Sequence, residues 1–216
     1  MIAKKLIGKK FPVLDGGYVR LVDAMPRHKP MEDRCVNVSR LSYRNKRITS
    51  DSELWSKLVN LGGAHIKALE WPTFDFEIKA PVVVWWQWDT YRIGRSFMSE
   101  SGRRVRLEEY YNPLGNSELS SEVKRHYARC VRLYDSLMEQ GVKREQARLV
   151  LPFGAAYYVR RYKTDAKSLL HFLTQRLNRE AQWEIRQYAR CIYEHIYTSL
   201  LPITAATLGS LYEADL

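Results

Sequence analysis

Two consecutive helices are predicted by the stretch Ser168-Leu-Leu-His-Phe-Leu-Thr-Gln-Arg-Leu-Asn-Arg-Glu-Ala-Gln-Trp-Glu-Ile-Arg-Gln-Tyr-Ala189. Apolar residues fall on one side of a helix over residues 166–177, and a second apolar stripe at helical spacing runs through residues 180–200. Between the stripes lies Arg176, a cation that a purely structural helix does not need there. A single arginine is more often an exposed residue on a helix face, so its neighbours decide its interpretation.

The signals upstream of this stretch predict an α+β protein that forms a single domain over residues 1–216. Strand signals fall at residues 12–24, around the turn Asp15-Gly16-Gly17, at 73–79 and at 155–163. Further helix signals fall at 51–61, 122–140 and 143–150. Residues 82–88 stay open between two alternatives, because their propensity favours a strand while Pro81 can also start a helix.

The 216-residue chain carries 35 Lys and Arg against 24 Asp and Glu, a net charge of +11. This excess favours anionic partners, either nucleic acid or phosphorylated small molecules. A membrane span is not expected, because no run of about 18 apolar residues occurs. The N-terminal residues lack the apolar core and cleavage pattern of a signal peptide, which predicts a cytoplasmic protein.

The cysteines and histidines predict neither a disulfide framework nor a metal site. Cys130 and Cys191 fall on apolar helical positions and are interpreted as core residues, whereas Arg34 could lower the pKa of Cys35. His171 lies in an apolar segment, where a lone histidine is more often a core residue than a ligand. No metal-type spacing joins the other histidines His28, His126 and His195.

Three basic elements lie beside small or amide residues. The turn Ser101-Gly102-Arg103 combines a hydroxyl, a glycine N–H and a forked guanidinium, which suits a phosphate, although the turn taken alone is better interpreted as a solvated basic loop. Arg148 is charged inside an apolar run and must therefore meet either an anion or an internal carboxylate. Arg176 is the third basic element. Gln87, which lies between two tryptophans, could hydrogen-bond to the edge of a pyrimidine base or satisfy backbone groups.

The chain resembles the flavin-dependent thymidylate synthases over residues 17–200. The C-terminal half carries most of the resemblance, through Ala147-Arg-Leu-Val-Leu-Pro152, Ser168-Leu-Leu-His-Phe-Leu173, Arg176 and Ala181-Gln-Trp-Glu-Ile-Arg-Gln-Tyr-Ala189. Matching segments follow in family order upstream: Arg40-Leu-Ser-Tyr43, Ala64-His65, Glu70, Lys79-Ala-Pro81, Gln87-Trp88 and Ser101-Gly-Arg103. This combination in this order is specific to the family.

The resemblance implies an α+β homotetramer whose active sites lie between subunits. Such enzymes bind FAD, dUMP and methylenetetrahydrofolate, and they take reducing equivalents from NADPH. By resemblance, Arg176 would contact the uracil and polarise it, making C5 nucleophilic toward the folate one-carbon unit. The residues implied to hold dUMP are Gln87, Ser101, Gly102, Arg103, Arg148 and Arg176. Those implied to face the flavin are Ser42, His65, Arg92 and His171.

The chain departs from the family pattern mainly at positions that contact the flavin. The family signature Arg-His-Arg reads Thr90-Tyr91-Arg92, and one extra residue separates Arg92 from Ser101. An expected Asn-Glu pair is replaced around Met98-Ser99. His171 stands where the family has a flavin-contacting Asn, and Glu180 where it has a His.

Two alternative functions follow from these observations. A flavin-free, folate-dependent hydroxymethylase of dUMP or dCMP would explain the changed flavin positions, since Arg and Gln contacts do not fix the exocyclic group of the base. A nucleic-acid-binding protein on the same scaffold would use the charge of +11, the 14 Tyr and the 6 Trp for phosphate contacts and base stacking.

Overall fold

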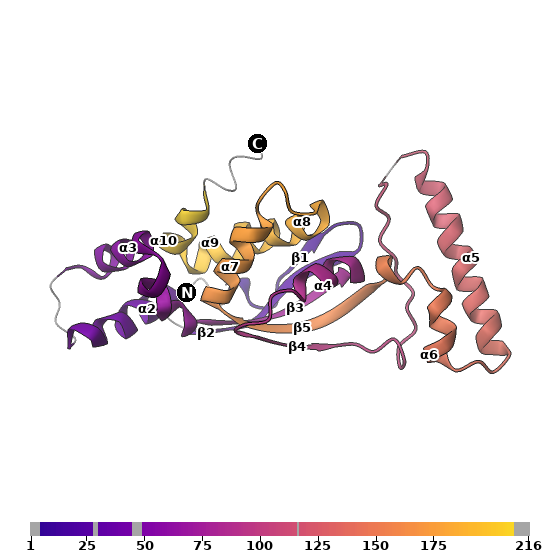
Figure 1. The fold of residues 1–216 in the computed structure, drawn as a ribbon, viewed down its shortest axis with the longest axis horizontal. Coiled ribbons are helices and arrows are strands. Elements are labelled where there is room, and N and C mark those ends of the chain that lie inside the picture. The colour runs from indigo at the N-terminus through magenta and orange to yellow at the C-terminus, as the bar shows by residue number, and fades with distance from the viewer. Residues whose placement is uncertain (1–4, 28–29, 45–48, 116, 210–216) are drawn as a thin grey trace.

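A five-stranded antiparallel sheet forms the centre of the molecule, with helices packed on one of its faces (Figure 1). The computed structural model describes all residues except 1–4, 28–29, 45–48, 116 and 210–216. The strand order is β1-β2-β3-β5-β4, and every neighbouring pair is antiparallel. The strands are β1 (Lys10–Val13), β2 (Gly17–Met25), β3 (Thr73–Pro81), β4 (Arg95–Ser99) and β5 (Tyr157–Asp165). The predicted α+β class is therefore confirmed.

Alternation along the strands explains why one face of the sheet is covered. In β3, Phe74, Phe76 and Ile78 are fully buried, while the side chains between them are partly exposed. The opposite face carries ion pairs between neighbouring strands, including Arg20–Glu77 at 2.5 Å and Arg161–Asp75 at 2.6 Å. This face is therefore polar, and the core lies between the sheet and the helices.

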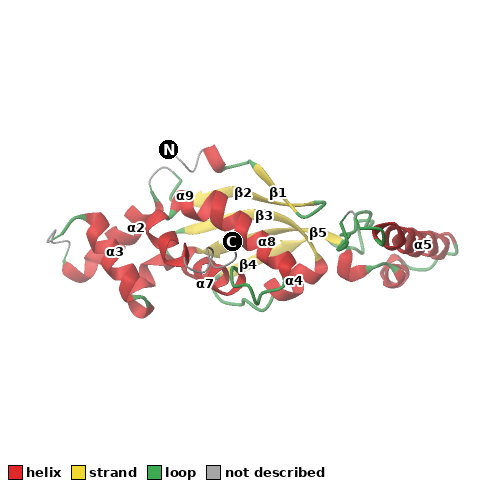
Figure 2. Ribbon diagram, turned by 90° about the horizontal axis from the view of Figure 1, so that it is seen from above, coloured by secondary structure: helices red, strands yellow, loops and turns green. Residues whose placement is uncertain are grey.

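The helices divide into three groups along the molecule (Figure 2). One end holds α2 (Met31–Arg40), η1 (Leu41–Tyr43), α3 (Asp51–Leu61) and η2 (Gly63–Glu70). The sheet face is covered by α4 (Val82–Trp88), α7 (Ala166–Arg176), α8 (Trp183–Ile192) and α9 (Thr198–Leu200). The π turn η5 (Tyr193–Tyr197) joins α8 to α9, and α10 (Pro202–Ala205), which packs against α3, and η6 (Ala206–Leu208) follow. The other end holds α5 (Ser120–Glu139), α6 (Arg144–Ala147), η3 (Arg148–Val150) and η4 (Phe153–Ala155).

Residues 82–88 form a helix, which resolves the alternative left open by the sequence. β3 pairs with β5 as far as Pro81, and Pro81 then precedes the first residue of α4 with extended backbone. The helix buries Val82, Val84, Trp85 and Trp88 against the core, a spacing that an alternating strand could not bury on one side. The α4 helix thereby carries Gln87 on a partly exposed turn beside α7.

The predicted single helix over residues 180–200 is wrong in its start and in its regularity. Residues 178–182 form a turn, in which the Asn178 side chain accepts a hydrogen bond from the Glu180 amide at 2.9 Å. Helix α8 starts only at Trp183, and a π turn interrupts the helical run after Ile192. Hydrophobic spacing continues through these breaks, so it could not reveal them.

Helix α5 stands apart from the sheet and is poorly covered within one chain (Figure 1). The sequence predicts an apolar stripe on it, but in the structure only Tyr134 of that stripe is buried. The side chains of Leu119 and Leu133 are 58% and 51% exposed. The interpretation of Cys130 as a core residue is therefore wrong, because its side chain is only partly buried on this helix.

Candidate active site

Arg176 and Gln87, chosen separately from the sequence, are in direct contact. Arg176 is at the C-terminal end of α7, and its Nη1 donates a hydrogen bond to Gln87 Oε1 at 3.2 Å. Its Nη2 lies 3.4 Å from the Gln87 carbonyl oxygen and 3.5 Å from Thr90 Oγ1. The Arg176 guanidinium also lies over the Tyr91 ring, 5.2 Å from its centroid. Residues at the end of α4 and just after it therefore fix the position of the Arg176 guanidinium at the end of α7.

All these partners of Arg176 are electrically neutral. No ion pair to Arg176 occurs within the described ranges, and its Nε is buried without a hydrogen-bond acceptor there. A partly buried guanidinium gains most from a negative charge or from a polarisable oxygen. The arrangement therefore suits an anionic or carbonyl-rich ligand.

A second cluster forms where the turn after β4 meets η3 and β5. A Cβ atom placed on Gly102 would lie 2.5 Å from the Tyr158 hydroxyl and 3.1 Å from Arg148 Nη1. The Tyr158 hydroxyl is buried and makes no hydrogen bond within the part of the chain that the structure describes. Burial raises the pKa of Tyr158, and the Arg148 charge opposes this rise. A hydroxyl and a guanidinium thus converge on a backbone without a side chain.

Arg148 has no carboxylate partner among the described residues, so the internal salt bridge considered from the sequence is absent there. Its guanidinium lies 6.0 Å from the centre of the Phe153 ring. An anion supplied from outside is therefore the better interpretation of this charge. Glycine is required at position 102 because a side chain there would collide with Tyr158 and Arg148. Its φ is not positive, so the sequence argument from the conformational range of glycine is wrong.

Arg103 behaves differently from its neighbours in the turn. Its Nε donates to Glu145 Oε2 at 2.9 Å, and its side chain is 66% exposed. Ser101 Oγ accepts a hydrogen bond from the Arg103 amide at 3.3 Å, which helps to close the turn. The structure thus brings Ser101, Gly102 and Arg148 together, whereas the Arg103 guanidinium is already paired.

Gly102→Ala is expected to weaken nucleotide binding without unfolding the protein. The new methyl group would displace the Tyr158 hydroxyl and the Arg148 guanidinium, and both lie at the end of their side chains. We expect the dissociation constant for dUMP to rise about tenfold or more, by loss of one charge-assisted contact. Isothermal titration calorimetry with dUMP checks this, and Gly209→Ala, where a Cβ meets no atom, is the matched control. Unchanged affinity in Gly102→Ala would contradict the assignment.

A cavity of about 1110 Å³ contains two of the four residues expected to face the flavin. Arg92 and His171 line it, together with Tyr91, Lys167 and Gly94. His171 is exposed there and meets the Tyr91 ring edge-on at 5.6 Å, so its interpretation as a core residue is wrong. Ser42 on η1 and His65 on η2 are exposed side chains and do not line this cavity. Glu70, at the end of η2, reaches its rim.

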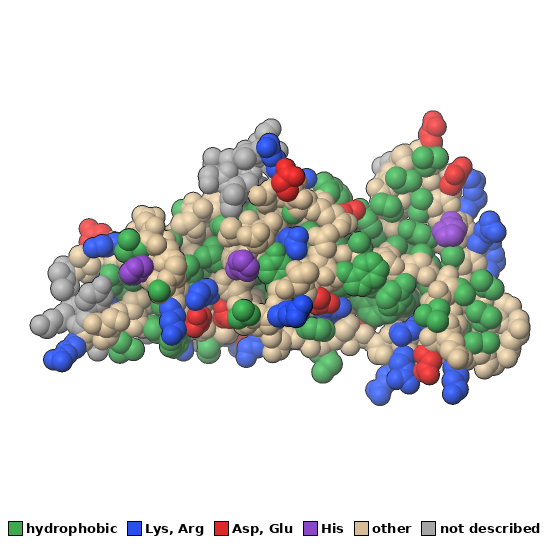
Figure 3. Space-filling model, in the orientation of Figure 1, with side chains coloured by type: hydrophobic (Ala, Val, Ile, Leu, Met, Phe, Trp, Pro, Cys, Tyr) green, Lys and Arg blue, Asp and Glu red, His purple; other side chains and the backbone are tan. Residues whose placement is uncertain are grey.

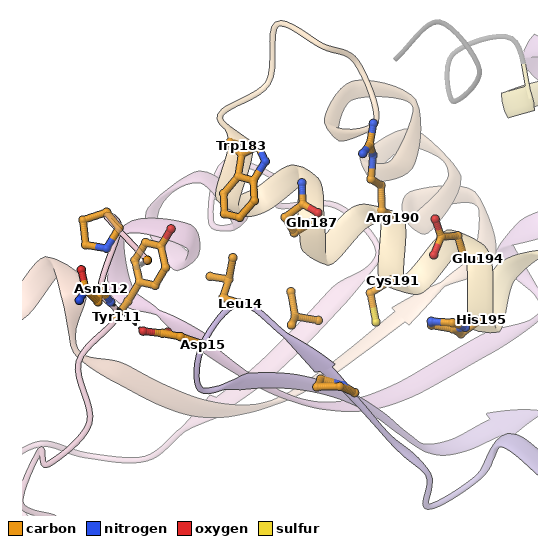
Figure 4. Close-up of a pocket in the computed structure, with 14 residues that line it drawn as sticks. Leu14, Asp15, Tyr111, Asn112, Trp183, Gln187, Arg190, Cys191, Glu194 and His195 are labelled. Atoms are coloured by element: carbon orange, nitrogen blue, oxygen red, sulfur yellow. Dashed lines mark hydrogen bonds between the residues drawn. The ribbon is translucent and has the colours of Figure 1, made fainter. Parts of the chain in front are cut away.

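A second cavity of about 590 Å³ lies between the β1–β2 hairpin, residues 111–115 and α8 (Figure 4). Figure 4 shows Trp183, Gln187 and Arg190 projecting from α8 above Leu14 and Asp15. Its lining includes none of the site residues predicted from the sequence.

Comparison with known proteins agrees with the resemblance seen in the sequence. The profile of the thymidylate synthase complementing protein family matches residues 20–202. The chain belongs to this family. It is 37% identical to the flavin-dependent thymidylate synthase of Thermus thermophilus, over 85% of this chain and 72% of the relative. It is 35% identical to that of Thermotoga neapolitana, over 96% of this chain and 98% of the relative. It is 33% identical to the enzyme of the same name from Thermosipho africanus, over 96% of this chain and 97% of the relative.

Cys35 and Cys191 of this thymidylate synthase family member are buried and are not placed for nucleophilic catalysis. Cys35 is fully buried on α2, and burial raises its pKa to about 12 despite the opposing charge of Arg34. The Arg34 charge does lower this pKa, as expected from the sequence, but burial raises it by more. Burial also raises the pKa of Cys191 to about 12. The predicted core position of Cys191 is confirmed.

Within the residues described by the structure, no three His, Cys, Asp or Glu side chains form a group that could hold a metal ion. His28, considered in the sequence analysis, lies outside those residues. None of the described helices is both long enough and apolar enough to cross a membrane.

Proposed function

We propose that this protein is a flavin-dependent thymidylate synthase, which transfers the one-carbon unit of methylenetetrahydrofolate to C5 of dUMP and yields dTMP. Its single catalytic domain comprises residues 1–216. The observation that carries the proposal is the Arg176 guanidinium, held by Gln87, Thr90 and Tyr91 without a neutralising carboxylate among the described residues. The names of the relatives support the same reaction.

The nucleotide is bound at both basic clusters. Arg148, Ser101 and the backbone at Gly102 hold the phosphate, because the Arg148 guanidinium and the Tyr158 hydroxyl converge on the Gly102 backbone, next to Ser101. Arg103 adds positive charge at the mouth of this site, and Gln87 offers its amide to the base. Arg176 stabilises negative charge that develops on the uracil oxygens, which makes C5 a better nucleophile.

The cavity lined by Arg92 and His171 fits a flavin nucleotide. Arg92 supplies positive charge, Lys167 is paired with Glu70 at 2.8 Å on the same wall, and the Tyr91 and Tyr162 rings supply apolar surface. Gly94, with a φ of +65°, brings backbone close to Asp165 and Ser168 at the same wall. FAD, reduced by NADPH, supplies the hydride that converts the transferred carbon into a methyl group. Ser42 and His65, on η1 and η2, lie outside this cavity, so their predicted flavin contacts are not made within it.

A homotetramer is the assembly that best completes this site. The described contacts join Gln87 to Arg176 and Gly102 to Arg148, but no contact joins one pair to the other. Apolar side chains are exposed on α5, and Figure 3 shows hydrophobic surface over the end of the molecule that carries this helix. Figure 3 also shows Lys and Arg side chains gathered beside it. A second copy would cover the apolar surface and could bring the two clusters together.

Leu133→Glu is expected to dissociate the assembly. The leucine is 51% exposed on α5, and a carboxylate there could not be buried against a second copy without a large desolvation cost. Light scattering should give four times the 25.4 kDa chain mass for the wild-type protein and a smaller mass for the variant. Arg132→Glu, at an exposed neighbouring position, is the matched control. A tetramer of undiminished stability in Leu133→Glu would place the interface elsewhere.

The visible spectrum of the freshly purified protein, with and without FAD and dUMP, tests the proposed function. We expect bound oxidised flavin that NADPH bleaches, and dTMP formed from dUMP and methylenetetrahydrofolate. Binding of dUMP or dCMP without flavin, and a hydroxymethylated product, would establish the flavin-free reaction instead. Salt-dependent binding of oligonucleotides without binding of dUMP would favour a nucleic-acid-binding protein.

A further inference from the structure

A chain of four side chains leads away from Arg176 into the body of the protein. Arg176 donates to Gln87 Oε1 at 3.2 Å, and Gln87 Nε2 donates in turn to Gln182 Oε1. Gln182 Nε2 donates to Glu184 Oε2 at 2.7 Å, and the Tyr111 hydroxyl donates to Glu184 Oε1 at 3.3 Å. The chain thus joins the end of α7, the end of α4 and the start of α8.

The carboxylate at the end of this chain determines its direction. A carboxylate only accepts hydrogen bonds, so Gln182 must turn its NH2 group toward Glu184 and its oxygen toward Gln87. Gln87 must then turn its NH2 group toward Gln182, which leaves its oxygen facing Arg176. The opposite orientation of Gln87 would place NH2 against the guanidinium, two donors facing each other. One negative charge therefore orients two neutral amides.

Local structure holds Glu184 in place. It lies in the first turn of α8, where a negative charge is favoured by the helix dipole. Tyr111 is buried, and burial together with the Glu184 charge raises its pKa, so its hydroxyl remains a donor at neutral pH. Gln182 occupies the N-cap position of α8 but makes no capping hydrogen bond with its side chain. Its amide is therefore available to bridge Gln87 and Glu184.

The two intervening amides also preserve the charge of Arg176. A carboxylate in direct contact would orient the guanidinium but would also neutralise it and compete with a ligand. Here the nearest partners are amide, hydroxyl and aromatic groups, and Glu184 acts only through Gln182 and Gln87. The cation is thereby oriented while its charge stays available to the pyrimidine.

We propose that Gln182 and Glu184 are positioning residues, which fix the orientation of the Gln87 amide and through it the guanidinium of Arg176. This proposal rests on the proposed function of Arg176 at the pyrimidine. It assigns the Gln-x-Glu sequence at the start of α8 a role in the nucleotide site, although neither side chain contacts Arg176 directly.

The experiment is a double-mutant cycle with dUMP affinity as the readout. Glu184→Gln and Gln182→Leu are each made in the wild-type protein and in Arg176→Ala. In the wild-type background we expect the dUMP dissociation constant to rise about threefold to tenfold, with a larger fall in kcat. In the Arg176→Ala background neither change should alter affinity further. Equal losses in both backgrounds would show a merely structural role and overturn the proposal.

Two matched variants sharpen the result. Asp33→Asn removes an exposed carboxylate from the first turn of α2 and should leave affinity and kcat unchanged. Glu184→Asp keeps an acceptor-only group and should retain more activity than Glu184→Gln, whose amide no longer dictates a direction. The reverse order of these two activities would contradict the polarity argument.

A crystal structure of ligand-free Glu184→Gln separates this proposal from the proposed function. We expect the contact between Arg176 Nη1 and Gln87 Oε1 to be lost, or the guanidinium to occupy more than one position. An unchanged contact would overturn the role of Glu184 whatever the enzyme catalyses. Failure of the wild-type protein to bind dUMP or form dTMP would instead overturn the proposed function, and the ligand-free structure would still decide the role of Glu184.

Discussion

Replacing Arg176 by Ala is expected to abolish formation of dTMP while leaving the protein folded. The guanidinium is the cation that faces the pyrimidine in the proposed site, and its loss removes stabilisation that grows as charge develops on the uracil. We expect kcat to fall at least about a hundredfold, as for the loss of one donor to a developing oxyanion. Rates of dTMP formation at saturating dUMP and folate measure this effect.

The fold should tolerate this change because Arg176 lies at the end of its helix and makes no ion pair within the described residues. Loss of a cation from the last turn of α7 costs about 0.3–1 kcal/mol through the helix dipole. Arg179→Ala is the control, since Arg179 is 73% exposed and its one ion pair among the described residues is with Glu180 at 3.8 Å. Full activity of Arg176→Ala would refute the assigned role, and a large loss in Arg179→Ala would point to general electrostatics.

The sequence predicts that Gln87 and Arg176 belong to one site, but it does not predict that their side chains are in contact. Arg176 lies at the end of a predicted amphipathic helix and Gln87 in a segment left open between strand and helix, and periodicity says nothing about how two segments pack. Because residues 82–88 form a helix, the Gln87 side chain points toward the end of α7. Its contact with Gln182, two residues before Glu184, depends on the turn at residues 178–182, which hydrophobic spacing does not reveal.

Two elements gave little signal in the sequence. Strand β4 pairs only with β5, at the edge of the sheet, and its side chains Phe97 and Met98 are exposed, so no alternation marks it. Helix α2 follows Pro30 and includes four charged residues among its ten, which obscures the buried positions of Met31, Cys35 and Val36. Tertiary contacts stabilise both elements, and a single sequence contains no direct record of them.

Two of the positions where this chain departs from the family signature lie beside the proposed catalytic cation. Thr90 and Tyr91 both contact Arg176, through a hydroxyl oxygen at 3.5 Å and an aromatic ring at 5.2 Å. Two neutral groups therefore stand beside the guanidinium where the family signature has an arginine and a histidine. Removing neighbouring positive charge lowers repulsion, and an aromatic face attracts a cation. The departures thus remain compatible with a working Arg176.

Arg148→Ala is expected to weaken dUMP binding more strongly than any other single change in the basic cluster around Gly102. Arg148 has no carboxylate partner in the described part of the chain, so its charge is available to the phosphate. Loss of one charge-assisted contact costs about 1.5–3 kcal/mol, which is a rise of about tenfold to a hundredfold in the dissociation constant. Calorimetric titration with dUMP provides the measurement.

Arg103→Ala is the decisive comparison, because it removes the same charge from the same cluster. The Arg103 guanidinium is 66% exposed and already paired with Glu145, and exposed ion pairs contribute about 0–1 kcal/mol. We therefore expect its dUMP dissociation constant to rise less than about threefold, mainly through loss of long-range attraction. Similar losses in both variants would mean that net charge alone attracts the nucleotide. A large loss confined to Arg148→Ala would instead locate the phosphate at the backbone of Gly102.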